Sequence, residues 1–486
     1  MTALYASQLL STSTTHSRYS LFRVLDGAWA AFTESLTGAG MRTLYPLAKS
    51  SILTLLARIS SGRLTVYTSP TEPPLHFGAS DAPEALRATL TVRSDAFWMR
   101  VALFTDLGLS EAFMFGDVDC DDVSALIQIL IVNRRVLTGA DADGYLASIL
   151  ARGRALTNNR FIGSLANSKA NISAHYDLGN TMFSSFLSSD MNYSSAVFLD
   201  FKQDLDKSIA PEDRETLYDA QMRKLRLVLG KANIQPGQRL LEIGTGWGSL
   251  AMMAAKSYGA VVDTLTLSTE QAALARERIC AAGLSSQITV HVMDFRQARD
   301  MPEWKGAFDR FVSVEMVEHV GKAFFEEYWA VADWCLKEDT GRGVVQGITI
   351  PEGRAKGYED SVDFIQKWIF PGGYLPNVAM MINTLAQGTE GRLLIDSVLN
   401  IGPHYARTLR EWKARFLASW DGTVKRALRE AYSLDEQGLE IFKRKWIYYF
   451  DYCEAGFKTR TLGDHILTFT REGNVEFGCD VDAERI

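Results

Sequence analysis

A short apolar run that ends in an acid and three alternating glycines constrains the fold of this chain more than any other segment. Residues 240–248 read Leu-Leu-Glu-Ile-Gly-Thr-Gly-Trp-Gly. The apolar part predicts a buried strand, and the glycines predict a tight turn where the backbone comes close to a ligand. Dinucleotide-binding turns have a different spacing, Gly-x-Gly-x-x-Gly, and the Gly-Lys-Ser/Thr ending of a phosphate-binding P-loop is missing. We therefore expect a nucleoside ligand.

Strands and helices alternate around this turn. We expect strands over Arg239–Ile243, Val261–Leu267, Ile288–Val292 and Phe308–Val314, and helices over Gln221–Lys231, Leu250–Ser257 and Thr269–Ala282. Such alternation predicts a parallel sheet wrapped by helices, a Rossmann-like α/β fold in which ligands bind at the carboxyl ends of the strands. Asp263 lies at nearly the offset of the ribose-binding acid of NAD folds, but it falls inside a strand. The pattern thus favours S-adenosylmethionine over NAD.

The amino-acid composition limits the classes of protein to which this chain can belong. A chain of 486 residues with 47% hydrophobic residues is long enough for two or three units, and its net charge of -7 argues against a nucleic-acid partner. The five cysteines are scattered without metal-ligand spacing, so we expect no metal site and a reducing, cytoplasmic environment. Residues 2–25 contain Ser, Thr and Arg but no acid, which resembles a mitochondrial targeting segment. A frayed terminus is the alternative.

The chain is expected to divide into four parts. Residues 1–60 form a helical extension, 61–150 a small α+β domain, 151–172 a linker and 173–475 the ligand-binding domain. In the extension, the apolar face of a helix over 26–60 contains Leu47, Ile52, Leu56 and Ile59. In the small domain we expect strands at Leu64–Tyr67, Leu75–Phe77 and Ala88–Val92.

Five further segments carry a family resemblance. They are His175–Asn180, Met191–Ala196, Ser313–Gly321, Ile369–Pro376 and Tyr448–Phe457. In this order and spacing the chain resembles cyclopropane-fatty-acyl-phospholipid synthases over roughly residues 165–475, and residues 62–130 resemble more loosely the amino-terminal domain of the longer members. The resemblance implies a class I methyltransferase sheet with helical insertions that form an acyl pocket, preceded by a smaller α+β domain.

The resemblance also implies which residues contact the methyl donor, S-adenosylmethionine. They are Tyr193, Ser194, Glu242, Gly244, Gly246, Gly248, Leu267, Gln271, Asp294 and Phe295. We expect Asp294 to accept a hydrogen bond from the adenine amino group, Phe295 to cover the ring and Gln271 to reach the ribose hydroxyls. Glu242 has an alternative role, which is to orient the glycine turn.

The implied reaction adds a carbon to the double bond of an unsaturated phospholipid acyl chain, giving a cyclopropane or a methylene branch. Positioning of the alkene beside the donor favours its attack on the methyl group. Desolvated aromatic faces stabilise the carbocation that this attack produces. In this family a bound bicarbonate accepts the proton, and its glutamate and tyrosine match Glu318 and Tyr405. Ser195 and Gln346 stand where many relatives carry cysteine and histidine. Because glutamine has no charge, Gln346 should bind an anion more weakly.

Cys453 matches a cysteine that is treated as catalytic in some members of the family. Its neighbours Asp451 and Glu454 should raise the pKa of the thiol, so we expect Cys453 to line the acyl pocket. His175 is either a base or a structural hydrogen-bonding residue, and His319 and His404 are interpreted as structural.

A phospholipid substrate implies an enzyme that docks peripherally on a membrane. Met222–Arg226 and Lys443–Trp446 are basic enough to face anionic headgroups, and a solvated helix face is the alternative for each. A homodimer is left open. Two other functions also stay open, a methyltransferase for a soluble olefin or polyketide and a non-catalytic lipid-binding module.

Overall fold

The computed structural model describes residues 44–137 and 179–475. It divides into two compact units, and each is described by itself. The small-sheet unit comprises Met1–Phe186, Lys356–Gly372 and Tyr405–Leu462, and the large-sheet unit comprises Leu187–Ala355, Gly373–His404 and Gly463–Ile486. The expected targeting segment, linker and His175 lie outside the described residues, and the four domain boundaries stay a prediction. No helix in the described ranges has the length and apolar character needed to cross a membrane.

The large sheet has seven strands in the order β10-β11-β9-β8-β5-β6-β7. The strands are β5 (Arg239–Ile243), β6 (Val261–Thr266), β7 (Ile288–Val292), β8 (Arg310–Val314), β9 (Arg342–Thr349), β10 (Leu393–Asn400) and β11 (Gly463–Arg471). β5 to β9 run parallel, whereas β11 is antiparallel to both of its neighbours. The predicted α/β fold is confirmed, and the four strands expected around the glycine turn are present within a few residues of their predicted bounds.

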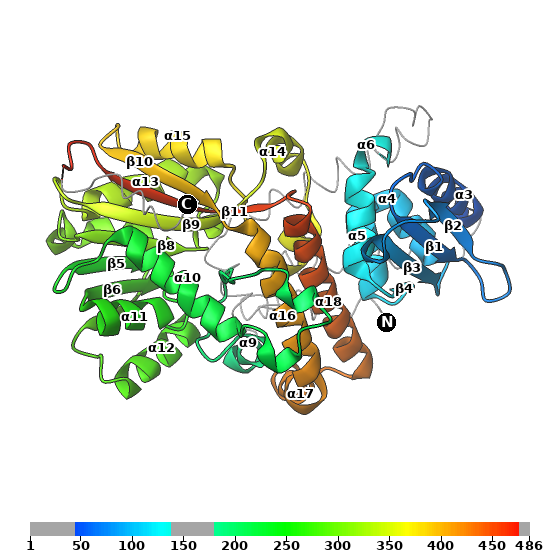
Figure 1. Cartoon of the computed structure of the whole chain (residues 1–486), viewed down its shortest axis with the longest axis horizontal. Coiled ribbons are helices and arrows are strands. Elements are labelled where there is room, and N and C mark those ends of the chain that lie inside the picture. Colours follow the sequence, from blue (N-terminus) through cyan, green and yellow to red (C-terminus); the bar gives the residue numbers. More distant parts are fainter. Residues whose placement is uncertain (1–43, 138–178, 476–486) are drawn as a thin grey trace, which may run out of the picture. The chain divides into compact units, whose positions relative to one another are not determined.

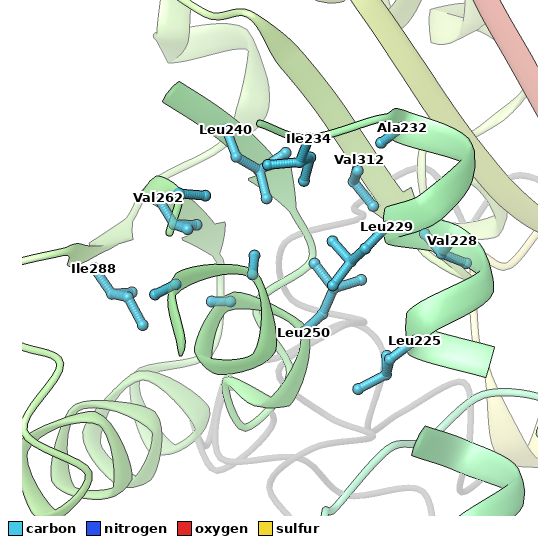
Figure 2. Packing of buried hydrophobic residues seen from close by; sticks show 14 of the residues in the cluster. Leu225, Val228, Leu229, Ala232, Ile234, Leu240, Leu250, Val262, Ile288 and Val312 are labelled. Carbon is cyan, nitrogen blue, oxygen red and sulfur yellow. The ribbon is translucent and has the colours of Figure 1, made fainter. Parts of the chain in front are cut away.

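Helices cover both faces of this sheet (Figure 1). One face carries α10 (Leu217–Ala232), α11 (Ser249–Tyr258) and α12 (Thr269–Ala281), and the other carries α13 (Phe325–Cys335) and α15 (Val378–Gly388). Figure 2 shows Leu225, Val228 and Leu229 of α10 in one buried cluster with the sheet residues Leu240 and Val312. These side chains are fully buried, so the 3.6-residue period of α10 is what fixes this helix on the sheet.

The small-sheet unit contains a four-stranded sheet in the order β2-β1-β3-β4. Its strands are β1 (Arg63–Tyr67), β2 (Leu75–Gly78), β3 (Arg87–Val92) and β4 (Val118–Cys120), and the helices near them in sequence are α3 (Tyr45–Leu56), α4 (Ala96–Met114), α5 (Val123–Val132) and α6 (Arg134–Leu137). The three predicted strands are confirmed. On α3, Ile52 and Leu56 are buried as expected, but Leu47 is 45% exposed. Leu47 therefore does not belong to the core, although Ile52 and Leu56 of the same predicted apolar face do.

Aromatic helices complete the small-sheet unit. They are α9 (Gly179–Phe186), α16 (Gly402–Ser419, from Tyr405 onward), α17 (Lys425–Tyr432) and α18 (Glu436–Lys458), and α14 (Glu352–Glu359) precedes a π-helix over Ile365–Ile369. The Phe186 ring lies 5.9 Å from Trp412, 5.6 Å from Trp446 and 5.5 Å from Phe450, measured between ring centroids. The aromatic residues expected downstream of the sheet thus gather in one cluster.

Neither basic segment forms the exposed patch that was expected. Lys224 is fully buried and Arg223 pairs with Glu215. In the other segment Lys445 is buried, and Arg444 donates to the Phe113 and Val118 carbonyl oxygens. Both the headgroup-facing and the solvated-face interpretation are therefore wrong for Lys224 and Lys445, whereas Arg226 is exposed and stays open to either interpretation.

Candidate functional site

The glycine turn follows β5 at the carboxyl edge of the large sheet. Gly244, Gly246 and Gly248 have φ values of +104°, +50° and +87°, a region that side chains with a Cβ rarely adopt. A Cβ on Gly244 would lie 3.2 Å from the Met316 Cβ, whereas a Cβ on Gly246 would meet no described atom within 4 Å. The backbone at Gly246 therefore borders open space that a ligand can enter.

Arg278 of α12 anchors the turn. Its Nη1 donates to the Trp247 carbonyl oxygen at 2.6 Å, and its Nη2 donates to the Asp190 carbonyl oxygen at 3.0 Å. The Ser249 hydroxyl also donates to the Asp190 carbonyl oxygen. Sequence reasoning missed Arg278, because a basic residue in the last turn of a helix is ordinary on a solvated face.

The residues expected at the donor follow the next two strands. Ser268 caps α12, and the Gln271 Oε1 accepts from the Thr266 hydroxyl at 3.0 Å, while Leu267 is half-buried just after β6. Asp294 caps the turn over Phe295–Asp300, and Arg296 engages both of its carboxylate oxygens at 2.8 Å. The Phe295 ring packs edge-on against Tyr328. The expected adenine and ribose contacts of these side chains stay predictions.

Glu242 is buried on β5. It accepts from the Thr264 hydroxyl at 2.6 Å, and the hydroxyls of Thr264 and Thr245 lie 2.8 Å apart. Burial raises the pKa of Glu242 to about 8, so the side chain holds a proton at neutral pH. These contacts link β5, β6 and the glycine turn, which favours the alternative that Glu242 orients the turn.

The segment with Tyr193 and Ser194 is held by α10. The buried Lys224 Nζ donates to the Ser194 hydroxyl at 2.6 Å, and the Gln221 Nε2 donates to the Ser194 carbonyl oxygen at 2.7 Å. Tyr193 beside them is half-buried. Lys224 was missed as a site residue, although a charged residue on the apolar face of a helix is a signal that could have found it.

Four polar side chains form what we call the acid–amide cluster: Glu315, Glu318, Gln346 and Asp464. They come from the segment after β8 and from β9 and β11, which are neighbours in the large sheet. The Gln346 Nε2 donates to the Glu315 Oε1 and to the Asp464 Oδ2, both at 2.9 Å. Glu315 and Asp464 were missed by sequence reasoning.

Burial dominates the electrostatics of this cluster. It raises the pKa of Glu318 to about 8, and the negative charge of Glu315 adds to the effect. Burial also raises the pKa of Asp464 well above its usual value, again with contributions from Glu315 and Glu318. The Glu318 Oε1 accepts from the Ile348 backbone N–H. The cluster is thus a set of carboxyl groups that amide groups hold in place. At neutral pH not all of these carboxyl groups are ionised.

Ser195 contributes its backbone to the cluster. Its N–H donates to the Glu315 Oε1 at 2.8 Å, and its hydroxyl donates to the Ala196 carbonyl oxygen at 3.1 Å. The large-sheet unit therefore brings together three of the five residues expected in catalysis, namely Ser195, Glu318 and Gln346.

The other two, Tyr405 and Cys453, belong to the small-sheet unit. Tyr405 is buried in α16 and its ring stacks on Phe457, with centroids 4.4 Å apart. Burial raises the pKa of the Cys453 thiol, and Asp363 adds to the shift. The pKa of the thiol is raised, as predicted, but the predicted cause is wrong. Its sequence neighbours Asp451 and Glu454 are not the groups that raise this pKa. A protonated thiol fits a pocket wall better than a nucleophile.

Two histidines occupy buried positions. Burial lowers the pKa of His319 to about 4, so this ring is neutral at physiological pH. The His404 Nδ1 accepts from the Phe198 backbone N–H at 3.2 Å, and its ring packs edge-on against Phe201. Both environments agree with the structural roles predicted for these side chains.

The parallel strands, the antiparallel β11 between β9 and β10, and the glycine turn at the carboxyl edge define the fold of a class I S-adenosylmethionine-dependent methyltransferase. The family model for mycolic acid cyclopropane synthetase matches residues 164–465. The chain belongs to this family, which confirms the resemblance drawn from the five segments.

Two relatives match most of the chain. It is 34% identical over 381 residues to the tuberculostearic acid methyltransferase UfaA1 of Mycobacterium tuberculosis, covering 78% of this chain and 82% of that protein. It is 33% identical over 387 residues to the cyclopropane-fatty-acyl-phospholipid synthase of Escherichia coli, covering 79% and 88%. Among solved structures, mycolic acid cyclopropane synthase CmaA1 complexed with SAH and CTAB is 27% identical, with a TM-score of 0.51, and covers 62% of this chain and 98% of its own.

Proposed function

We propose that this chain transfers the methyl carbon of S-adenosylmethionine to the double bond of an unsaturated acyl chain in a phospholipid. The observation that carries the proposal is the placement of the acid–amide cluster on the same carboxyl edge as the glycine turn, within one unit. The turn provides a nucleoside site, and the cluster provides buried proton acceptors next to it. The names of the two relatives, a cyclopropane-fatty-acyl-phospholipid synthase and a tuberculostearic acid methyltransferase, support a lipid acceptor.

The donor residues expected from the sequence are part of this proposal. Gly244, Gly246 and Gly248 shape the turn, the open space at Gly246 receives the donor, and Arg278 keeps the turn in place. Gln271, Asp294 and Phe295 follow the neighbouring strands at the same edge and hold the nucleoside. When bound, the donor supplies an electrophilic methyl group. The chain's own task is to orient it and to exclude water.

Tyr405 and Cys453 are proposed to act on the acyl side. The stacked pair of Tyr405 and Phe457 and the ring cluster around Phe186 offer aromatic faces to a hydrophobic chain and to a developing positive charge. The half-buried, protonated Cys453 adds apolar surface. We assign Cys453 to the pocket wall and Tyr405 to a hydrogen-bonding role.

The product is a cyclopropane or a methylene branch. One relative is named a cyclopropane-fatty-acyl-phospholipid synthase and the other a methyltransferase, so the two names do not decide between the products. Both outcomes need the same methyl transfer and the same loss of a proton, and they differ in where the remaining electron pair forms a bond.

A phospholipid acceptor also requires the protein to reach a bilayer, and we propose peripheral attachment. Lys224 and Lys445 are buried and therefore are not part of that contact. A homodimer stays a prediction.

Incubation of the purified protein with labelled S-adenosylmethionine and vesicles tests the function. We expect label in the acyl chains of unsaturated phospholipid vesicles and none in matched saturated vesicles. Mass spectrometry locates the label, and proton NMR separates a ring from a methylene branch. Label in a soluble olefin offered alongside, with none in the vesicles, would contradict the proposal and favour a methyltransferase for soluble substrates.

A further inference from the structure

Two donors at the positions that the family resemblance links to bicarbonate, Ser195 and Gln346, are already in use in this structure. The Ser195 N–H and the Gln346 amide both donate to the same oxygen, the Glu315 Oε1, at 2.8 Å and 2.9 Å. The Gln346 amide donates in addition to Asp464. A carboxylate of the chain therefore receives the hydrogen bonds that a bound bicarbonate would need.

The atoms left over in the cluster are acceptors. Within the described residues the Glu318 Oε2, the Gln346 Oε1 and the Asp464 Oδ1 are buried without a hydrogen-bond partner, and all three side chains are at least nine-tenths buried. The negative charge of Glu315 beside these oxygens repels an anion and attracts a proton, which agrees with the raised pKa values of Glu318 and Asp464. The residues present thus do not fit bicarbonate.

The backbone at Glu315 is also unusual. Its φ of +48° lies in the left-handed region, where a glycine would be less strained, and its N–H donates to the Gln346 carbonyl oxygen at 2.8 Å. Strain of this kind, of order 1–3 kcal/mol, concentrates at functional sites. Here the strained residue carries the carboxylate on which Ser195 and Gln346 converge.

We propose that the Glu315 carboxylate is the proton acceptor of this enzyme, in place of bicarbonate, and that Gln346 is the residue that positions it. This proposal rests on the proposed function. The alkene π electrons form a bond to the methyl carbon as its bond to sulfur breaks, and the sulfur keeps that electron pair. A C–H bond of the added carbon then breaks and its proton goes to Glu315. The C–H electron pair closes the ring or, after a hydride shift between the former alkene carbons, forms the methylene double bond.

Buried charges around Glu315 suit this role. Lys224, fully buried on α10, interacts electrostatically with Glu315, Asp464, Asp190 and Glu242. Burial lowers the pKa of the Lys224 amine, and these carboxyl groups oppose that shift. The two N–H donors stabilise a carboxylate that must be ionised before it can accept a proton. Asp464, which shares a side-chain hydrogen bond with Glu315, lies next to the proton after transfer.

The test compares product formation in carbonate-free buffer and in buffer with added bicarbonate, using unsaturated phospholipid vesicles. We expect the wild-type rate to be the same in both buffers. Glu315→Gln removes the base but keeps the size of the side chain, and we expect a loss of about 100-fold or more. Glu315→Gly also frees the Ser195 and Gln346 donors, so added bicarbonate should restore its rate by about tenfold or more. Glu326→Gln, an exposed acid on α13, is the matched control and should behave like wild type.

Each outcome decides one claim. A wild-type rate that collapses without bicarbonate, or a Glu315→Gln variant as active as wild type, overturns the role of Glu315 while the proposed function stands. No product from wild type in either buffer contradicts the proposed function itself and this proposal with it. SAH binding measured by calorimetry shows that the variants are folded, and if one is not, the wild-type comparison alone decides.

Discussion

The glycine turn and the acid–amide cluster lie on the same edge of one sheet, but they are built in different ways. The turn is a run of consecutive residues, 244–248, whose function depends on backbone freedom at three glycines. The cluster is made of side chains from segments that are far apart in the sequence, and Gln346 and Asp464 are separated by 118 positions. The turn is therefore a general device for a nucleoside donor, whereas the cluster determines what happens to the acceptor.

This difference predicts that changes in the two regions separate binding from chemistry. Changes in the cluster should reduce product formation and leave donor binding intact. Changes in the turn should reduce donor binding first.

The largest expected effect follows from Glu318→Gln. Glutamine can still accept the Ile348 N–H, but it cannot exchange a proton at the buried Oε2 position. We expect product formation to fall by about 100-fold or more, with SAH affinity within about twofold of wild type. Single-turnover kinetics and calorimetry measure the two quantities. A loss of donor affinity would instead place Glu318 in the donor site.

A smaller effect is expected from Gly246→Ala. The new Cβ points into space that holds no described atom, so it should meet the donor, and donor affinity should fall by about tenfold. Gly283→Ala is a matched control, because Gly283 also has a positive φ, of 71°, and open space around it, but it lies in the turn after α12. If both variants lose donor affinity equally, Gly246 does not border the donor.

The glycine turn could be predicted from the sequence more fully than the acid–amide cluster, and the reason is physical. Period and turn chemistry act over a few residues, so β7 and the neighbouring strands and helices were predictable to within a few positions. The position of the Glu315 carboxylate was not predictable, because the direction of this side chain depends on a left-handed backbone that no side-chain pattern encodes. Lys224 and Asp464 became site residues only through the packing of α10 and the pairing of β11.

Arg278→Met tests the anchor of the turn. The change keeps an apolar stem of similar length but removes the charged donors to the Trp247 and Asp190 carbonyl oxygens. We expect thermal unfolding to show a loss of about 2–3 kcal/mol, with a weaker effect on donor affinity than Gly246→Ala. Unchanged stability would show that the turn holds its shape without Arg278.

A pH dependence of stability is expected at Glu242. Its pKa is about 8 in the folded protein against 4.5 for a free side chain, so the unfolded chain ionises first as pH rises. Between these values each higher pH unit lowers stability by about 1 kcal/mol, and Glu242→Gln should remove that contribution. The free energy of unfolding of the variant, relative to that of wild type, should therefore rise from pH 5 to pH 8. A constant difference would mean that Glu242 is ionised in the folded protein.

The central claim is that the cluster removes a proton from the carbon that the donor delivers. Donor carrying a fully deuterated methyl group, offered to wild-type protein with unsaturated phospholipid vesicles, tests it directly by mass spectrometry of the acyl products. The account predicts that the added carbon keeps two of its three deuterium atoms, as a ring or as a methylene branch. An added carbon that keeps all three would show that the proton leaves from elsewhere on the acyl chain and would contradict the account.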